Sequence, residues 1–261
     1  MYPTQSCGLV SIQRSVASSV DHKKTKAFVA LLLTFVAGCV DIVGYLMIYN
    51  MFTAHMTGNT VHLANDILQA HWPEAAMAAC VIGCFVAGSI IGRTIIEMGV
   101  RSDSRSVASA TLLIEAILIA AVALDPGSWI SGGGILVPLA MLAAAMGIQT
   151  ATLTRIGSLT VHTTFVTGML NKLAQLVSQA LVLSLDLRRG ENVVAERGKV
   201  LGQARFIFSI WLLYLVGAGT GTWMKSIWGM RSLFLPAGLA LAIIAVDQFS
   251  PLSIEEEQDQ P

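Results

Sequence analysis

The chain alternates between long apolar stretches and shorter polar ones, and this pattern predicts a helical membrane protein. Crossing ~30 Å of hydrocarbon takes about 20 residues of α-helix at ~1.5 Å per residue. We therefore expect an all-α integral membrane protein with one transmembrane domain over residues 27–249 and disordered polar tails at 1–26 and 250–261. The six predicted spans are Ala27–Tyr49, Ala75–Met98, Val107–Leu124, Gly132–Thr154, Ala204–Ser226 and Ser232–Phe249.

Two further stretches have mixed polarity and look like broken or interfacial helices. Thr57–Ala70 is helical in pattern, but its 14 residues would cover only ~21 Å. Thr163–Leu187 is long enough to span, yet Arg155 and Arg188 flank it on either side. If both flanks stay on the same face of the membrane, this segment enters and returns, or lies in the interface. We predict a re-entrant or interfacial helix for both stretches, with a full span as the alternative.

The distribution of lysine and arginine predicts the orientation. Basic residues precede the first span, whereas the segment from Asn50 to Glu74 contains none. Only Lys225 and Arg231, out of 16 basic residues, fall on the predicted outer side. The positive-inside rule therefore places both termini in the cytoplasm. The net charge is zero, so nothing indicates a nucleic-acid partner.

The two halves of the chain repeat the same order of elements: a span, a broken segment and two more spans. Three spans in each half force the halves, residues 27–124 and 132–249, into opposite orientations. Inverted repeats of this kind are common among secondary transporters, whose sites lie at the repeat interface. The identities that support the alignment are Thr57-Gly58 with Thr167-Gly168 and Leu63-Ala64 with Leu173-Ala174, and Asn65 aligns with Gln175.

Several sequence blocks resemble a known family. They are FVAGCVDIVGYL (Phe35–Leu46), FTAHMTGNTVHLA (Phe52–Ala64), AMGIQTATL and TTFVTGMLNKLA. Together they resemble the YoaK-like bacterial integral membrane proteins, a family of unknown function with an intact TGN motif. The resemblance covers residues 27–249 and implies an inner-membrane protein of about six helices. It does not identify a substrate. A polar loop at Leu187–Gln203 departs from it.

Two acidic residues lie inside predicted spans and are the first candidates for function. Asp41 is in the first span and Glu115 near the middle of the third. Placing an acid at the centre of a membrane helix costs ~2.5–3.5 kcal/mol on insertion scales, so both should face the protein interior or water. Each is either a proton or cation site, or a structural partner in an interhelical hydrogen bond.

The HMTGN sequence is the second candidate site. Thr57, Gly58 and Asn59 at a helix start could present N–H groups to an anion or a substrate carboxylate, or could simply cap the helix. His55 and His62 are expected to be polar lining. His62 and Asp66, four residues apart, would make a metal pair, but no zinc motif supports a metal site.

The second half supplies a counterpart to each of these features. Thr167 and Gly168 repeat the threonine and glycine, Asn171 is the displaced asparagine, and Lys172 takes the place of His62. Gln149 occupies roughly the position in the fourth span that Asp41 has in the first. Gln149 either completes the site from the opposite half or forms a bond between helices.

These features favour a secondary transporter or permease for a small solute, coupled to protons through Asp41 or Glu115. A dimeric channel, and homo-oligomers in general, stay open as alternatives, as does a structural or regulatory membrane partner. A membrane-embedded enzyme is disfavoured, because the chain has no G-x-S-x-G, P-loop or zinc motif. No cofactor is expected.

Overall fold

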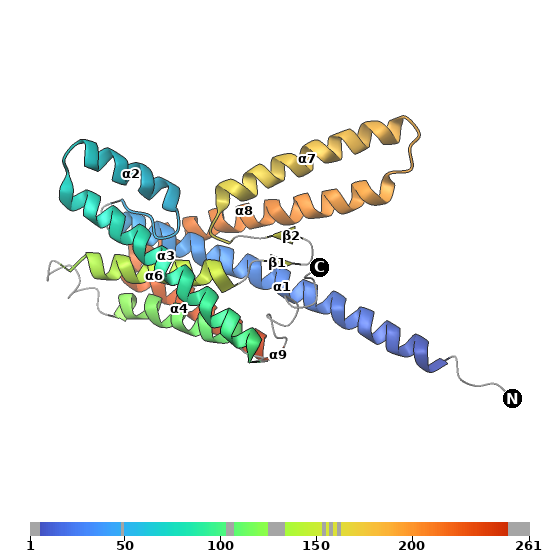
Figure 1. Ribbon diagram of the computed structural model, residues 1–261, viewed down its shortest axis with the longest axis horizontal. Coiled ribbons are helices and arrows are strands. Elements are labelled where there is room, and N and C mark those ends of the chain that lie inside the picture. The colour runs from blue at the N-terminus through green and yellow to red at the C-terminus, as the bar shows by residue number, and fades with distance from the viewer. Residues whose placement is uncertain are drawn as a thin grey trace.

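The computed structural model describes residues 6–47, 50–102, 107–124, 134–152, 155–156, 159–160 and 163–249. These residues form helices and one antiparallel pair of two-residue strands, which confirms the predicted helical architecture (Figure 1). The elements are α1 (Ser6–Met47), α2 (Met56–Leu68), α3 (Trp72–Arg101), α4 (Val107–Leu124), α6 (Leu136–Thr152), β1 (Arg155–Ile156), β2 (Leu159–Thr160), α7 (Val166–Arg188), α8 (Val194–Trp228), the 3-10 helix η1 (Gly229–Leu233) and α9 (Phe234–Phe249).

Four helical stretches among the described residues are long and apolar enough to cross a membrane. They are Lys24–Leu46, Trp72–Arg101, Val107–Leu124 and Val194–Gln248. The last stretch contains two of the predicted spans, because it runs from α8 through η1 into α9. The remaining predicted span corresponds to α6, which is apolar but has 17 residues, fewer than the ~20 that a perpendicular crossing needs.

Two segments that were expected to be irregular are helical. α1 begins at Ser6 rather than Ala27, so the structure has a helix where the sequence predicts a disordered tail. Neither glycine nor proline, the two residues least favourable in a helix interior, occurs between Gly8 and Gly38. Similarly, α8 begins at Val194, inside the predicted polar loop, because this part of α8 packs along α7.

The helices pack as two interlocked pairs. α3 from the first half lies along α6 from the second, and α8 from the second half lies along α1 from the first. α2 folds back on α3, and α7 folds back on α8, so each half has one helical hairpin (Figure 1). α4 and α9 pack against each other, and α4 also packs against α6.

Glycines allow these two pairs of helices to approach closely. A Cβ atom at any of four positions would overlap a backbone carbonyl oxygen of the facing helix. Small residues commonly bring membrane helices together in this way. The four contacts are Gly88 against Ala144 and Gly147 against Phe85 between α3 and α6, and Gly38 against Tyr214 and Gly217 against Phe35 between α1 and α8.

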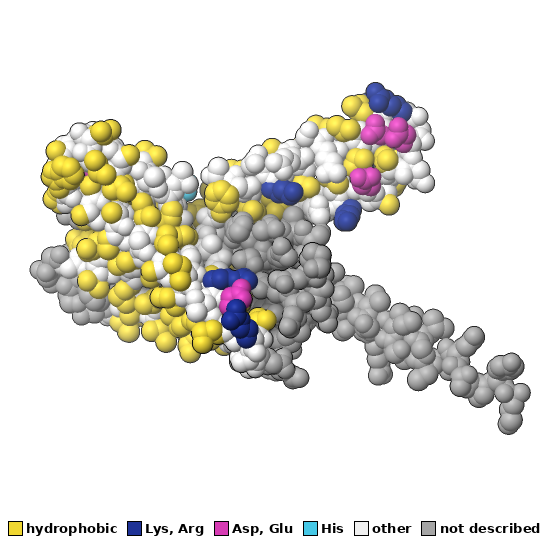
Figure 2. All heavy atoms as spheres, viewed as in Figure 1, with side chains coloured by type: hydrophobic (Ala, Val, Ile, Leu, Met, Phe, Trp, Pro, Cys, Tyr) yellow, Lys and Arg dark blue, Asp and Glu magenta, His cyan; other side chains and the backbone are white. Residues whose placement is uncertain are grey.

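Charged side chains gather toward one end of the molecule. Figure 2 shows lysine, arginine, aspartate and glutamate over the α7–α8 hairpin and over the final turns of α3. On the same face, the end that carries the turn between α2 and α3 is hydrophobic. On this face, the charged side chains thus lie apart from the α2–α3 turn.

Candidate functional site

Asp41 is the centre of a buried hydrogen-bond cluster that joins three parts of the chain. Only 3% of the residue is exposed. Its Oδ1 accepts hydrogen bonds from the backbone N–H groups of Thr53 and Ala54, at 2.7 Å each. Its Oδ2 accepts a hydrogen bond from the Tyr214 hydroxyl at 2.6 Å. The carboxylate therefore holds the segment before α2 against α1 and links both to α8.

Asn59 closes the same segment from the other side. The residue is fully buried, its Oδ1 accepts from the N–H of Phe52 at 3.0 Å, and its Nδ2 donates to the carbonyl of Phe52 at 2.6 Å. Gly58 completes the arrangement, because a Cβ atom there would press on the rings of His55 and Phe52. The glycine and asparagine of the TGN motif therefore fasten the loop before α2 to the start of the helix.

The start of α2 has fewer free donors than the sequence suggested. The N–H groups of Gly58 and Asn59 both donate to the carbonyl of His55, at 3.1 and 3.3 Å. Thr57 is exposed, and His62 is half-buried one turn further along. An anion or carboxylate site at this helix start would therefore compete with backbone hydrogen bonds that the protein already makes.

The second copy of the motif keeps the glycine contact and loses the amide. Gly168 lies against the ring of Phe165, while Thr167 is exposed. Met169, 5% exposed, occupies the position of the buried asparagine. Asn171 is exposed and does not replace that asparagine, which corrects the sequence hypothesis. The reason is geometric, because two residues along a helix correspond to a rotation of ~200°.

In the second half, amide and hydroxyl groups form the hydrogen bonds that correspond to those of the Asp41 carboxylate. Gln149 Nε2 donates to the carbonyl of Leu33 at 2.8 Å and to Thr163 Oγ1 at 3.2 Å. The hydroxyls of Thr150 and Thr164 lie 2.7 Å apart. The segment before α7 is thereby held on α6, as the segment before α2 is held on α1. The sequence placed Gln149 alone at this position, whereas Gln149 and Thr150 share it.

Glu115 differs from Asp41, because its carboxyl group has no hydrogen-bond partner in the described ranges. It is fully buried in α4, and neither carboxyl oxygen makes a hydrogen bond within the described part of the chain. Gln149 Oε1 is the other buried side-chain oxygen in those ranges without a partner. Since unpaired buried polar atoms are rare and each costs ~1–3 kcal/mol, these three oxygens on two residues call for an explanation.

Helix register places Glu115 and Gln149 at the same level. Thr152 Oγ1 donates to Thr111 Oγ1 at 3.1 Å and so joins α6 to α4. Glu115 lies one turn after Thr111, and Gln149 lies one turn before Thr152. The contact therefore runs forward along α4 and backward along α6, so the two helices are antiparallel. One cluster of buried residues there includes Ile119 and Val122 from α4 and Leu142 and Met146 from α6.

The structure thus sorts the predicted site residues into three groups. Asp41, Gly58 and Asn59 surround the loop before α2, with His55 beside them. Glu115 and Gln149 lie at one level of the α4–α6 contact. The remaining residues are on exposed or half-buried surfaces of α2 and α7: Thr57, His62, Thr167, Gly168 and Asn171.

Sequence reasoning missed three polar residues that join separate elements, two of them within these clusters. Tyr214 and Thr163 are partners of Asp41 and Gln149. Asp247 is 1% exposed, and its Oδ2 accepts from the N–H of Ser109 at the start of α4, at 3.0 Å. Only Asp247 carried a signal, as an acid near the end of an apolar stretch. Tyrosine and threonine are common in membrane helices and therefore do not stand out.

The histidines and acids do not assemble into a metal centre among the residues described. No group of three or more histidine, cysteine, aspartate or glutamate side chains lies close enough to hold an ion there. The nearest candidate from the sequence was His62 with Asp66. The Asp66 side chain instead accepts a hydrogen bond from the neighbouring Asn65 at 3.3 Å.

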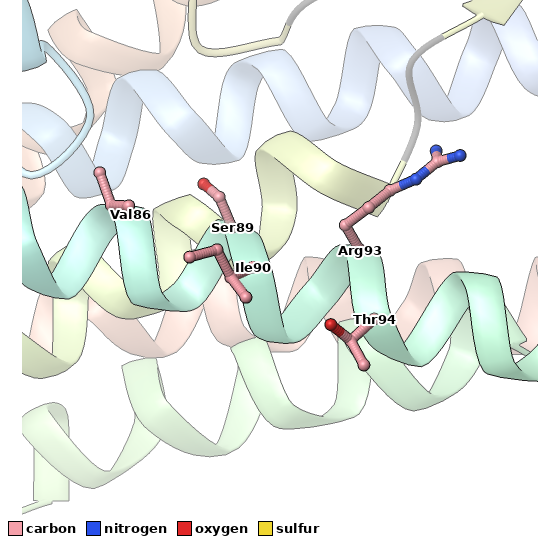
Figure 3. Close-up of a pocket in the computed structure, with 5 residues that line it drawn as sticks. All are labelled: Val86, Ser89, Ile90, Arg93 and Thr94. Atoms are coloured by element: carbon pink, nitrogen blue, oxygen red, sulfur yellow. The ribbon is translucent and has the colours of Figure 1, made fainter.

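An open hollow of about 380 Å³ lies on α3, away from the buried clusters (Figure 3). Its lining residues are Val86, Ser89, Ile90, Arg93 and Thr94, all from this one helix. Ser89 Oγ donates to the carbonyl of Gly147 at 3.1 Å, and Arg93 Nε donates to Glu97 at 2.9 Å. The polar groups of the hollow thus take part in helix packing and in an ion pair within α3.

Comparisons with known proteins agree with this architecture. A family model described as "Protein of unknown function (DUF1275)" matches residues 29–246. The chain belongs to this family. It is also 29% identical over 151 residues to the UPF0700 transmembrane protein YoaK of Bacillus subtilis (strain 168). That match covers 56% of this chain and 65% of the relative, so it spans just under two thirds of the relative's length.

No solved structure matches the chain. The family and the relative confirm the predicted YoaK-like membrane protein. The family description and the name of the relative specify neither a ligand nor a transported solute.

Proposed function

We propose that the protein is a secondary transporter or permease for a small solute, with its working site between two oppositely oriented halves. The observation that carries the proposal is Glu115, a fully buried carboxyl group without a hydrogen-bond partner among the described residues. It lies where α4 of the first half meets α6 of the second. Intramembrane acids are costly and typically mark ion or substrate pathways, and transporter sites lie at repeat interfaces.

The two broken segments support an inverted repeat of three spans in each half. His55 precedes α2 with φ −91° and ψ 71°, and Phe165 precedes α7 with φ −100° and ψ 70°. In each case, the ring of this residue lies against the glycine three positions later, Gly58 or Gly168. The pairing of α3 with α6 and of α1 with α8 is the reciprocal contact that a two-fold relation between halves requires.

Matching polar stripes on the two hairpins support a solute path. Each stripe is a row of polar side chains, exposed or half-buried, on the side of the helix that also carries the TG glycine. Polar groups at membrane depth need water, protein or solute around them. The stripes are His62, Asn65 and Gln69 on α2, and Lys172, Gln175 and Gln179 on α7.

The charge distribution supports an inner-membrane orientation with both termini in the cytoplasm. The exposed Arg188 and Arg189 lie at the turn between α7 and α8, while the turn between α2 and α3 has neither lysine nor arginine. The positive-inside rule assigns the α7–α8 turn to the cytoplasm and the α2–α3 turn to the outside. The two hairpins would thus extend toward opposite faces of the membrane.

A solute screen followed by a flux measurement tests this function. We expect at least one class of small solute to raise the melting temperature of the purified full-length protein. In proteoliposomes, that solute should accumulate when an inward proton gradient is applied. Glu115→Gln should lower the uptake roughly tenfold or more, equivalent to ~1.4 kcal/mol or more of lost stabilisation. The control is Glu97→Gln, whose carboxylate is 47% exposed and paired with Arg93.

A structural or regulatory membrane protein is the second candidate function. The full set of hydrogen bonds around Asp41 and Asn59 favours it, because these polar groups are explained by packing alone. This second function would replace the transport proposal if no solute stabilised the protein and the Glu115→Gln variant fully complemented a deletion strain. Uptake that equilibrates without responding to a proton gradient would indicate a channel instead.

A further inference from the structure

We infer that Glu115 and Gln149 form a proton-binding site, in which a protonated Glu115 carboxyl donates a hydrogen bond to Gln149 Oε1. The presence of this proton follows from the structure of the α4–α6 contact. Its role as the coupling ion rests on the proposed transport function. The site joins the two halves, because α4 belongs to the first and α6 to the second.

The first step in the argument is the orientation of the Gln149 amide. Its Nε2 donates to the carbonyl of Leu33 in α1 and to Thr163 Oγ1 before α7. The Leu33 carbonyl can only accept, so it requires the amide nitrogen on that side and the amide oxygen must point elsewhere. This oxygen is buried and has no donor among the described residues. Gln149 therefore needs a donor from another helix.

The second step is the position of the Glu115 carboxyl. Counting from the Thr111–Thr152 hydrogen bond, Glu115 lies ~6 Å further along α4, and Gln149 lies ~4.5 Å back along the antiparallel α6. Glu115 and Gln149 are both fully buried at this contact. Two side chains whose unpaired oxygens are acceptors therefore lie at the same level of one interface.

The third step is the choice of ligand. An ionised Glu115 would place a bare charge beside the amide oxygen, with both groups acting only as acceptors. One proton on the carboxyl removes the charge and supplies the missing donor for Gln149 at the same time. A hard metal cation such as Mg²⁺ or Ca²⁺ takes about six or more oxygen ligands, whereas the described residues hold three unpaired buried side-chain oxygens. The neighbouring Thr111 hydroxyl already donates to the carbonyl of Ala108.

Infrared spectroscopy of the purified full-length protein at neutral pH tests this inference directly. We expect a carboxylic-acid C=O band from a buried protonated group, which is lost in Glu115→Gln and retained in Glu97→Gln. Gln149→Leu should shift that band, because the O–H group loses its acceptor. Glu115→Gln should melt close to the wild type, since its amide N–H can donate to Gln149 Oε1 in place of the proton.

Three results would overturn the inference: no such band in the wild type, the same band in Glu115→Gln, or a band that appears only after sodium or potassium is removed. The last would assign the site to a monovalent cation. The infrared result is separable from the flux result. The band without solute flux would keep the proton site and reject transport, and flux without the band would keep transport and reject the proton site.

Discussion

Replacing Asp41 with alanine is expected to destabilise the protein more than replacing any polar residue of the HMTGN sequence. The substitution leaves the N–H groups of Thr53 and Ala54 buried without an acceptor. At ~1–3 kcal/mol for each unsatisfied donor, the free energy of unfolding should fall by about 2–6 kcal/mol. Thermal or denaturant unfolding of the purified protein in detergent measures this loss.

Two matched variants separate the structural role of Asp41 from a transport role. Asp41→Asn keeps a carbonyl oxygen for the two N–H groups, and Tyr214→Phe removes only the hydroxyl donor. Each should cost ~1 kcal/mol, the usual net value of one hydrogen bond. If Asp41→Ala instead unfolded like the wild type but had lost solute flux, Asp41 would be a functional group and the structural assignment would be wrong.

The second large effect is expected at the glycines between the interlocked helices. Gly217→Ala would push a methyl group into the carbonyl oxygen of Phe35 in α1, a backbone atom that cannot rotate away. Overpacking of this kind typically costs ~1–3 kcal/mol. Gly219→Ala, two residues along the same helix, meets nothing within 4 Å. It should gain about 0.5–1 kcal/mol from the better helix propensity of alanine.

The same contrast is available on α3. Gly88→Ala would meet the carbonyl of Ala144 in α6, whereas Gly83→Ala meets nothing within 4 Å. Melting temperatures of the four variants should therefore move in opposite directions within each helix. Equal stability of Gly217→Ala and Gly219→Ala would contradict the close contact between α1 and α8.

Local pattern was enough to predict the helices, because apolar length is a property of the sequence itself. Thr57–Ala70 was predicted within one or two residues of α2, and the glycines of both TG pairs take part in equivalent contacts. The extension of α1 to Ser6 was missed, because polarity was taken as a sign of disorder although no glycine or proline breaks the helix. The early start of α8 depends on packing against α7, which no local pattern contains.

The candidate site could be predicted only as a set of residues, not as a set of contacts. Asp41 and Glu115 look alike in sequence, as single acids in apolar spans. What separates them is tertiary structure, because Asp41 meets a tyrosine 173 residues away and Glu115 meets no donor among the described residues. The level shared by Glu115 and Gln149 likewise depends on the antiparallel register of α4 and α6. Such long-range pairings cannot be read from one chain.

The orientation of the two hairpins is the most direct test of the inverted architecture. Single cysteines replace Gln69 in the α2–α3 turn and Glu191 in the α7–α8 turn, both of which are exposed. The background has its native cysteines replaced, with serine at Cys39 to keep the hydrogen bond to the carbonyl of Gly217. A third cysteine at Arg101, at the end of α3 that the positive-inside rule assigns to the cytoplasm, serves as the control for that side.

A membrane-impermeant maleimide is then applied to intact cells and to opened membranes. Oppositely oriented halves predict labelling of Gln69→Cys in intact cells, and labelling of Glu191→Cys and Arg101→Cys only after the membranes are opened. Labelling of Gln69→Cys and Glu191→Cys from the same side of the membrane would contradict the inverted repeat and, with it, a transport site between the two halves.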